Sequence, residues 1–238
     1  MSEPVALGAV AREVRAPRAA GIAGLAFATL FVASLVLLRH HPAAGASEQE
    51  IADFYRDDQS GNLVLVGLYL VPFSGIAFLW FIAVIRSRVG DREDRFFATV
   101  FFGSGLLFVA MLFAAAAAAA APVAATRFLD APQPSADAIS FARSLAFTCL
   151  YVYGVRAGAV FMIVTSTIGL RTGTLPRWLV GAGYAAALVL LFSIAFLEAI
   201  VLVFPLWVAA VSVHILRSPA SSGSDDTAGG RPGHAAAR

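Results

Sequence analysis

Long apolar stretches alternate along this chain with short polar segments that carry most of its charge. Six apolar stretches contain almost no charged residue, and they occupy residues 19–38, 62–85, 96–121, 145–170, 177–196 and 199–216. An α-helix rises about 1.5 Å per residue, so about 20 apolar residues cross a hydrocarbon layer of about 30 Å. The pattern predicts an all-α protein, a polytopic bundle of about six transmembrane helices within residues 19–217.

The last two predicted spans belong to one apolar tract, residues 177–216, which is interrupted by its single acidic residue, Glu198. A continuous helix of that length would be about twice as long as the membrane is thick. We therefore predict that the tract folds back near Glu198.

The arginines predict the orientation of the spans, because short loops rich in basic residues stay cytoplasmic. With six spans, 12 of the 17 basic residues lie on the side of the two termini. The opposite side carries four: Arg39, Arg56, Arg127 and Arg143. Both termini are predicted to be cytoplasmic. An alternative for the first span is a cleaved signal peptide, because Ala44-Gly45-Ala46 resembles a cleavage site.

The polar segments outside the spans have distinct patterns. Residues 1–18 are expected to be a cytoplasmic N-terminal segment, and residues 218–238 a disordered cytoplasmic tail that lacks apolar periodicity. Residues 48–57 are expected to form a short amphipathic helix on the outer surface, because Ser47 and Glu50 have the spacing of a capping box.

Small residues mark the expected packing surfaces within the bundle. Eight alanines, residues 114–121, end the third span before Pro122. Gly154 with Gly158, and Gly181 with Ala185, have a four-residue spacing that favours close approach of neighbouring helices.

Composition supports a membrane location. Hydrophobic side chains make up 59% of the chain, charged ones 13%, and the mean hydropathy is +0.80. The lipid bilayer is the expected partner, and a net charge of +2 with arginines at the ends of apolar runs gives no nucleic-acid surface. All basic residues are arginine, which together with the alanine content suggests a genome rich in G and C.

The polar turn after the fourth span, Arg171 to Trp178, contains Gly173 to end one helix and Pro176 to begin the next. We interpret Arg171, Arg177 and Trp178 as interfacial anchors.

This turn, with segments 50–55, 78–81 and 204–208, resembles a family of actinobacterial polytopic integral membrane proteins. The family has no assigned activity, so the resemblance implies a fold and no function.

Arg156 is the charged residue that lies within a predicted span, where ionised side chains usually face the bundle interior or a wet cavity. Its depth depends on where the span begins: Leu145 places it near the middle, and Leu150 places it about 9 Å deep. One hypothesis pairs Arg156 with Glu198 to hold the helices together. The other has Arg156, with Tyr153, Tyr151 and Tyr184, bind an anionic or polar ligand from outside.

No catalytic, metal-binding or cofactor-binding motif is recognised in the sequence. The leading expectation is a non-enzymatic structural or accessory bundle. A small transporter or ligand-binding protein is the alternative, and a membrane-embedded enzyme is the least favoured hypothesis.

Overall fold

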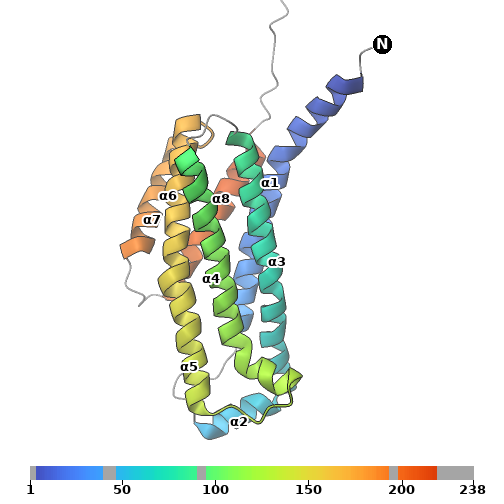
Figure 1. Ribbon diagram of the computed structural model, residues 1–238, viewed down its shortest axis with the longest axis vertical. Helices are drawn as coiled ribbons and strands as arrows, with labels where there is room; N and C mark the ends of the chain where they lie inside the picture. Colours follow the sequence, from blue (N-terminus) through green and yellow to red (C-terminus); the bar gives the residue numbers. More distant parts are fainter. Residues whose placement is uncertain (1–3, 40–46, 90–94, 193–197, 219–238) are drawn as a thin grey trace, which may run out of the picture.

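The computed structural model describes residues 4–39, 47–89, 95–192 and 198–218, and within these ranges every regular element is a helix (Figure 1). The all-α prediction is confirmed for this part of the chain. The elements are α1 (Pro4–Leu38), α2 (Glu48–Arg56), α3 (Asp58–Val89), α4 (Arg95–Phe128), α5 (Ala136–Phe147), η2 (Thr148–Gly154), α6 (Val155–Thr172), α7 (Arg177–Phe192), η3 (Glu198–Leu202) and α8 (Val203–Arg217).

Five helical stretches among the described residues are long and apolar enough to cross a membrane. They are Arg18–Leu38, Asp58–Arg86, Phe96–Phe128, Ala136–Thr172 and Ala199–Arg217. The fifth predicted span corresponds to α7, whose 16 residues extend about 24 Å. That length is below the thickness of the hydrocarbon core, and the predicted turn between α7 and η3 lies mostly outside the described residues.

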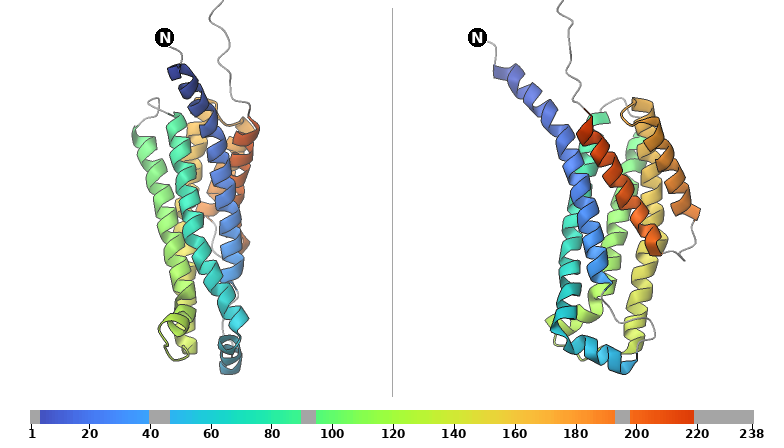
Figure 2. Two further views of the ribbon diagram at one scale, coloured as in Figure 1. Left: turned by 90° about the vertical axis from the view of Figure 1, so that its right-hand side faces the viewer. Right: turned by 180° about the vertical axis from the view of Figure 1, so that it is seen from behind.

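The long helices run roughly parallel, and α2 lies across one end of the bundle (Figures 1 and 2). We call this end the α2 end. In Figure 2, α1 lies beside α3 and α8, and α7 lies beside α6 at the opposite end of the bundle. The turn between α6 and α7 is therefore remote from α2.

A cluster of phenylalanine side chains fills the centre of the bundle. Phe78 of α3 packs against Phe27 of α1 with ring centroids 4.6 Å apart and against Phe161 of α6 at 5.1 Å. Phe108 of α4 contacts Phe204 of α8 at 4.4 Å. All five rings are almost completely buried. Because lipid tails are as apolar as these side chains, close packing rather than exclusion of water stabilises the cluster.

At Gly24, α1 packs closely against α8 and α3. A methyl group on Gly24 would collide with the side chains of Ser212 and Phe81. By contrast, Gly181 and Ala185 are exposed, and a methyl group on Gly181 would meet nothing within 4 Å. The prediction that these two residues form an internal packing surface is wrong, because they lie on the face of α7 that points away from the bundle.

The helix of the third span continues beyond its predicted end. α4 includes Pro122 and ends at Phe128, seven residues after Ala121. A proline removes one backbone donor, and the helix tolerates this loss by bending. In Figure 1, the last turns of α4 turn aside from its axis.

The helix of the fourth span begins earlier than predicted. α5, η2 and α6 form one apolar helical stretch of 37 residues, Ala136–Thr172. Its length is about 55 Å, whereas a hydrocarbon core is about 30 Å thick. A span of this length can therefore extend beyond the hydrocarbon core at its α5 end.

The chain ends differ in how much of them is described. The predicted N-terminal segment, residues 1–18, is helical from Pro4 onward as the first part of α1. The predicted tail, apart from Ser218, lies outside the described residues.

α2 forms the predicted capping box. The hydroxyl of Ser47 accepts a hydrogen bond from the Glu50 amide, and the Ser47 amide donates to the Glu50 carboxylate at 2.7 Å. Hydrogen bonds from the Ser47 backbone and hydroxyl lower the pKa of Glu50. At the start of α3, the Ser60 hydroxyl and backbone amide and the Gln59 amide donate to Asp57 and lower its pKa.

Candidate functional site

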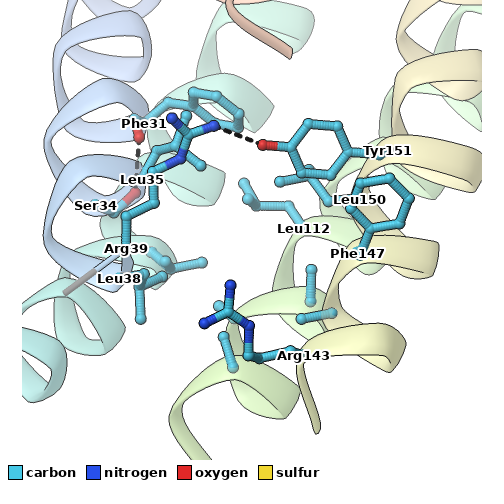
Figure 3. Close-up of a pocket in the computed structure, with 15 residues that line it drawn as sticks. Phe31, Ser34, Leu35, Leu38, Arg39, Leu112, Arg143, Phe147, Leu150 and Tyr151 are labelled. Carbon is cyan, nitrogen blue, oxygen red and sulfur yellow. Dashed lines mark hydrogen bonds between the residues drawn. The ribbon is translucent and has the colours of Figure 1, made fainter. Parts of the chain in front are cut away.

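A cavity of about 370 Å³ lies between α1, α3, α4, α5 and η2, in the half of the bundle nearer α2 (Figure 3). Eleven of its fifteen lining residues are apolar, and the other four are Ser34, Arg39, Arg143 and Tyr151. The apolar ones are Phe31, Leu35, Leu38, Val71, Leu112, Ala115, Ala116, Ala119, Ala146, Phe147 and Leu150. A space of this size and lining is within the usual range of small-molecule sites.

Two arginines from distant parts of the sequence line this cavity. Arg39 directly follows the last residue of α1, and its guanidinium donates a hydrogen bond of 2.7 Å to the Tyr151 hydroxyl. Figure 3 shows this bond connecting α1 with η2, while the Arg143 side chain points from α5 toward the same space. No acidic residue is among the described residues that line the cavity. The charged side chains among these lining residues are both arginines.

The alanine run of α4 leaves room for the cavity. Ala115, Ala116 and Ala119 have the helical spacing that places them on one face, and that face borders the space. Ala117 lies on another face and is exposed. A methyl group reaches only a short distance from the helix axis, so α4 does not fill the gap between α1 and α5. The prediction that this run is an internal surface is correct for part of it only.

Tyr151 is held by the local structure of η2. Residues Thr148–Gly154 form a π-helical segment, and the Val155 amide donates to the carbonyl of Leu150, five residues earlier. Such segments insert a wider turn into an α-helix and are often found at functional sites. The Tyr151 ring also stacks on Phe147 with centroids 4.7 Å apart and an interplanar angle of 13°. These contacts orient the phenol toward Arg39.

Arg156 follows the π-helical segment but does not line the cavity. Its guanidinium donates to the backbone carbonyls of Val152 at 2.8 Å and Tyr151 at 3.2 Å. The side chain thus extends toward the N-terminal end of its own helix, as side chains on helices usually do. The side chain of Glu198 lies outside the described part of the structure, so the pairing of Arg156 with Glu198 stays a prediction.

The tyrosines grouped with Arg156 are not brought together. The Tyr153 side chain is 56% exposed. The Tyr184 hydroxyl forms a hydrogen bond of 2.7 Å with Thr167, which lies 11 residues, or about 16 Å, beyond Arg156 along the helix. Arg156, Tyr153, Tyr151 and Tyr184 are the candidate ligand-binding residues whose side chains the structure describes, and of these Tyr151 alone lines the cavity.

The three predicted anchoring residues lie at the other end of the bundle. The Arg171 guanidinium is 4.4 Å from the ring centroid of Phe97, and Trp178 is 68% exposed. Arg177 begins α7 and is exposed. Between them, Gly173 ends α6 in a left-handed conformation with φ 67°, as the sequence predicted.

A second polar feature lies where α6, α7 and α8 meet. The hydroxyl of Ser166 and the indole nitrogen of Trp207 are buried, and neither has a hydrogen-bond partner among the described residues. Both crowd the Cα of Gly183, where an added methyl group would collide with them. This tight packing leaves no room for a ligand, so we treat the feature as part of the interface rather than as a site.

The described residues contain no cluster of three or more histidine, cysteine or acidic side chains that would hold a metal ion. The chemistry of the cavity is instead that of binding. Guanidinium groups present planar sets of donors to a carboxylate or phosphate, and the alkyl and aromatic walls accept an apolar group.

Sequence reasoning did not identify Arg39 and Arg143 as site residues. Both were assigned to the outer ends of spans, and 104 positions separate them in the sequence. Their placement at a span boundary, together with the alanines of α4, was the available signal. Nothing in the local pattern indicates that the two helices meet around one space.

Comparison of the chain with protein-family models, curated proteins and solved structures found no match. The predicted actinobacterial membrane-protein family therefore stays a prediction, and the functional argument rests on the residues of the cavity.

Proposed function

We propose that this protein is a membrane-embedded binding protein for an organic anion, and that the cavity lined by Arg39, Arg143 and Tyr151 is its binding site. The observation that carries the proposal is the lining itself: two guanidinium groups, no acidic side chain among the described lining residues, and an apolar wall. Hydrogen bonds that involve a charged group contribute about 1.5–3 kcal/mol each, so two arginines supply much of the affinity for an anion.

The proposal includes a bacterial plasma-membrane location with six spans and both termini in the cytoplasm. α7 then provides the fifth crossing together with residues that follow Phe192. In this orientation the α2 end faces outward, and the cavity accepts its ligand from the outside. The distribution of arginines along the sequence supports this orientation.

A thermal-shift screen tests the binding function. Wild-type protein in nanodiscs of zwitterionic lipid is heated with a panel of carboxylates, organic phosphates and neutral alcohols of matched size. We expect at least one anion to raise the melting temperature and its neutral analogue to have no effect. Arg39→Gln and Arg143→Gln each remove one charged hydrogen-bond donor, which contributes about 1.5–3 kcal/mol. Each variant should therefore bind that anion at least tenfold more weakly, because a tenfold change corresponds to about 1.4 kcal/mol.

Arg127→Gln is the matched control. Arg127 also lies at the α2 end, where it forms an ion pair with Asp58, but it does not line the cavity. This variant should bind the anion as wild type does. Equal stabilisation of the wild type and both cavity variants, or no stabilisation by any anion, would contradict the proposal.

A structural or accessory role is the second candidate. The observation that favours it is the aromatic core, in which phenylalanines of α1, α3, α4, α6 and α8 form one connected cluster. Under this hypothesis, Arg39 and Arg143 only join helices. Substitution of either arginine then lowers the melting temperature, and no anion raises the melting temperature of the wild type or of the variants.

A further inference from the structure

A charged side chain satisfies the backbone of the π-helical segment η2. In an α-helix, the Val155 amide would donate to the carbonyl of Tyr151, four residues earlier. In η2 this amide donates instead to the carbonyl of Leu150, so Tyr151 loses its usual backbone donor. The Arg156 guanidinium donates to the Tyr151 carbonyl at 3.2 Å and to the Val152 carbonyl at 2.8 Å. The arginine therefore supplies the donor that the wider turn removes.

The surroundings of the segment make this donor important. Leu150 and Gly154 are buried, and Arg156 is half-buried. A backbone carbonyl without a hydrogen-bond partner costs free energy wherever water cannot reach it. A guanidinium group carries several donors, and its charged hydrogen bonds are stronger than those of neutral groups. One arginine can thus serve two carbonyls of the same turn.

The glycine that ends η2 fits the same turn. A methyl group on Gly154 would lie 3.3 Å from the carbonyl oxygen of Cys149, five residues earlier, which is a tight contact. A side chain at this position would crowd that carbonyl, and glycine avoids the conflict. Gly154 and Arg156 are therefore two local features that favour a π turn here.

The π turn determines which face of α5 packs on α4. Its hydrogen bonds close over five residues instead of four, so it contains one residue more than the α-helical turn it replaces. Its loss would rotate α5 about its own axis by one residue, about 100°. At present Ile139 and Ala142 are buried, whereas Ser140 and Arg143 are exposed. After the rotation Ser140 and Arg143 would occupy the places of Ile139 and Ala142, and Arg143 would leave the wall of the cavity.

We infer that Arg156 is a positioning residue for the cavity. By donating to the carbonyls of Tyr151 and Val152, it holds the π turn. The turn directs the Tyr151 phenol toward Arg39 and keeps Arg143 on the side of α5 that lines the cavity (Figure 3). This role concerns the shape of the cavity and does not depend on which ligand occupies it.

Removal of the guanidinium changes the balance between two registers of α5. The π turn is left with an unpaired carbonyl at Tyr151. The α-helical register pairs this carbonyl with the Val155 amide again, and it turns Ser140 and Arg143 toward α4. We expect Arg156→Leu to adopt the α-helical register.

Cysteine accessibility reports the register of α5. Ile139→Cys and Ser140→Cys are made separately in the full chain with Cys149→Ser, and each protein in nanodiscs is treated with a water-soluble maleimide. Ile139 lies about 48 Å along the helix from Arg171, beyond a hydrocarbon core of about 30 Å, so the reagent reaches it. With Arg156 present, Ser140→Cys should react at least about tenfold faster, because the buried position reacts only after local opening.

In Arg156→Leu the order of the two rates should reverse. Ile139 then takes the place of the exposed Ala138, and Ser140 becomes buried. Arg156→Lys keeps a charged donor and should retain the wild-type order, as should Arg156→Gln, whose amide still donates. Arg127→Leu is the control, because Arg127 pairs with Asp58 at the α2 end.

A one-residue deletion provides an independent test. Deleting Cys149 from the Arg156→Leu protein removes the residue by which the π turn exceeds an α-helical turn. The shortened segment forms a continuous α-helix that leaves α5 in its wild-type register. Ser140→Cys should again react faster than Ile139→Cys. If Arg156→Leu alone does not fold, the deletion variant should still fold and show this order.

An unchanged order of rates in folded Arg156→Leu would overturn the positioning role, even if the melting temperature falls, because Arg156 would then only stabilise the bundle. A deletion variant that does not fold, or that fails to restore the order, would overturn it as well. Either result leaves the proposed anion site untouched, since that site is tested by the ligand response of Arg39→Gln and Arg143→Gln.

Discussion

The guanidinium of Arg39 donates a hydrogen bond to the hydroxyl of Tyr151, a residue 112 positions later in the chain. The bond joins the end of α1 to the π-helical segment η2 and closes one side of the cavity. The same two residues therefore serve the packing of the bundle and the shape of the site.

Tyr151→Phe removes the acceptor of this bond and keeps the aromatic ring. We expect a loss of about 0.5–1.5 kcal/mol in the free energy of unfolding, the net contribution of a typical hydrogen bond. Stacking on Phe147 should be retained. Reversible unfolding in detergent, with Tyr153→Phe as control, measures the effect. Equal losses in the two variants would show that the Arg39 contact does not stabilise the protein.

Arg156→Gln tests the role of a charge within a predicted span. Arg156 donates to the carbonyls of Val152 and Tyr151 next to η2, so its loss should cost about 1.5–3 kcal/mol of stability. Because Arg156 does not line the cavity, the affinity for an anionic ligand should change by less than about threefold. A loss of anion binding without a loss of stability would place the site at Arg156 instead.

Gly24→Ala and Gly181→Ala form a matched pair. A methyl group on Gly24 collides with Ser212 and Phe81, and such overpacking costs about 1–3 kcal/mol. A methyl group on Gly181 meets nothing, so the gain in helix propensity, about 0.5–1 kcal/mol, should stabilise the protein. Thermal melting of both variants in the same nanodiscs checks the opposite signs. Two shifts of the same sign would contradict the observed helix packing.

Acid should loosen α2. The pKa of Glu50 is lowered in the folded protein by hydrogen bonds from Ser47, so the stabilisation that Glu50 gives to the helix is complete above its ordinary value of 4.5. It is lost as the pH falls through the lowered value. We expect amide hydrogen exchange in residues 50–54, corrected for the intrinsic pH dependence, to lose protection progressively as the pH falls below 4.5. Glu50→Gln should remove this pH dependence, and a pH response unchanged by that substitution would exclude Glu50 as its origin.

Much of the architecture was predictable because it depends on local chemistry. Apolar stretches of about 20 residues predict helices in a membrane, Ser47 with Glu50 predicts the start of α2, and Gly173 predicts the end of α6. Each of these signals depends on residues that are neighbours in the sequence or one helical turn apart. For the residues that it describes, the structure confirms the helices, the start of α2 and the end of α6.

The orientation of helix faces was not predictable from spacing. Gly181 and Ala185 have the spacing of a packing surface yet are exposed, whereas Gly24, which was not selected, lies where α1 packs closely against α8. A membrane helix is apolar on all sides, so the polar face that reveals the orientation of a soluble helix is absent. The cavity was missed for the same reason, because Arg39, Arg143 and the alanines of α4 meet only when the helices are placed around one another.

Photo-crosslinking with an organic carboxylate that carries a diazirine at its apolar end tests the proposed anion site most directly. After irradiation in nanodiscs, we expect the label in peptides that contain Leu112–Ala119 or Arg143–Tyr151, and its disappearance from the Arg39→Gln, Arg143→Gln double variant. The contrary result is labelling that is spread over exposed positions such as Trp80 and Leu188 and is equal in the wild type and the double variant. It would show that the probe only dissolves in the surrounding lipid.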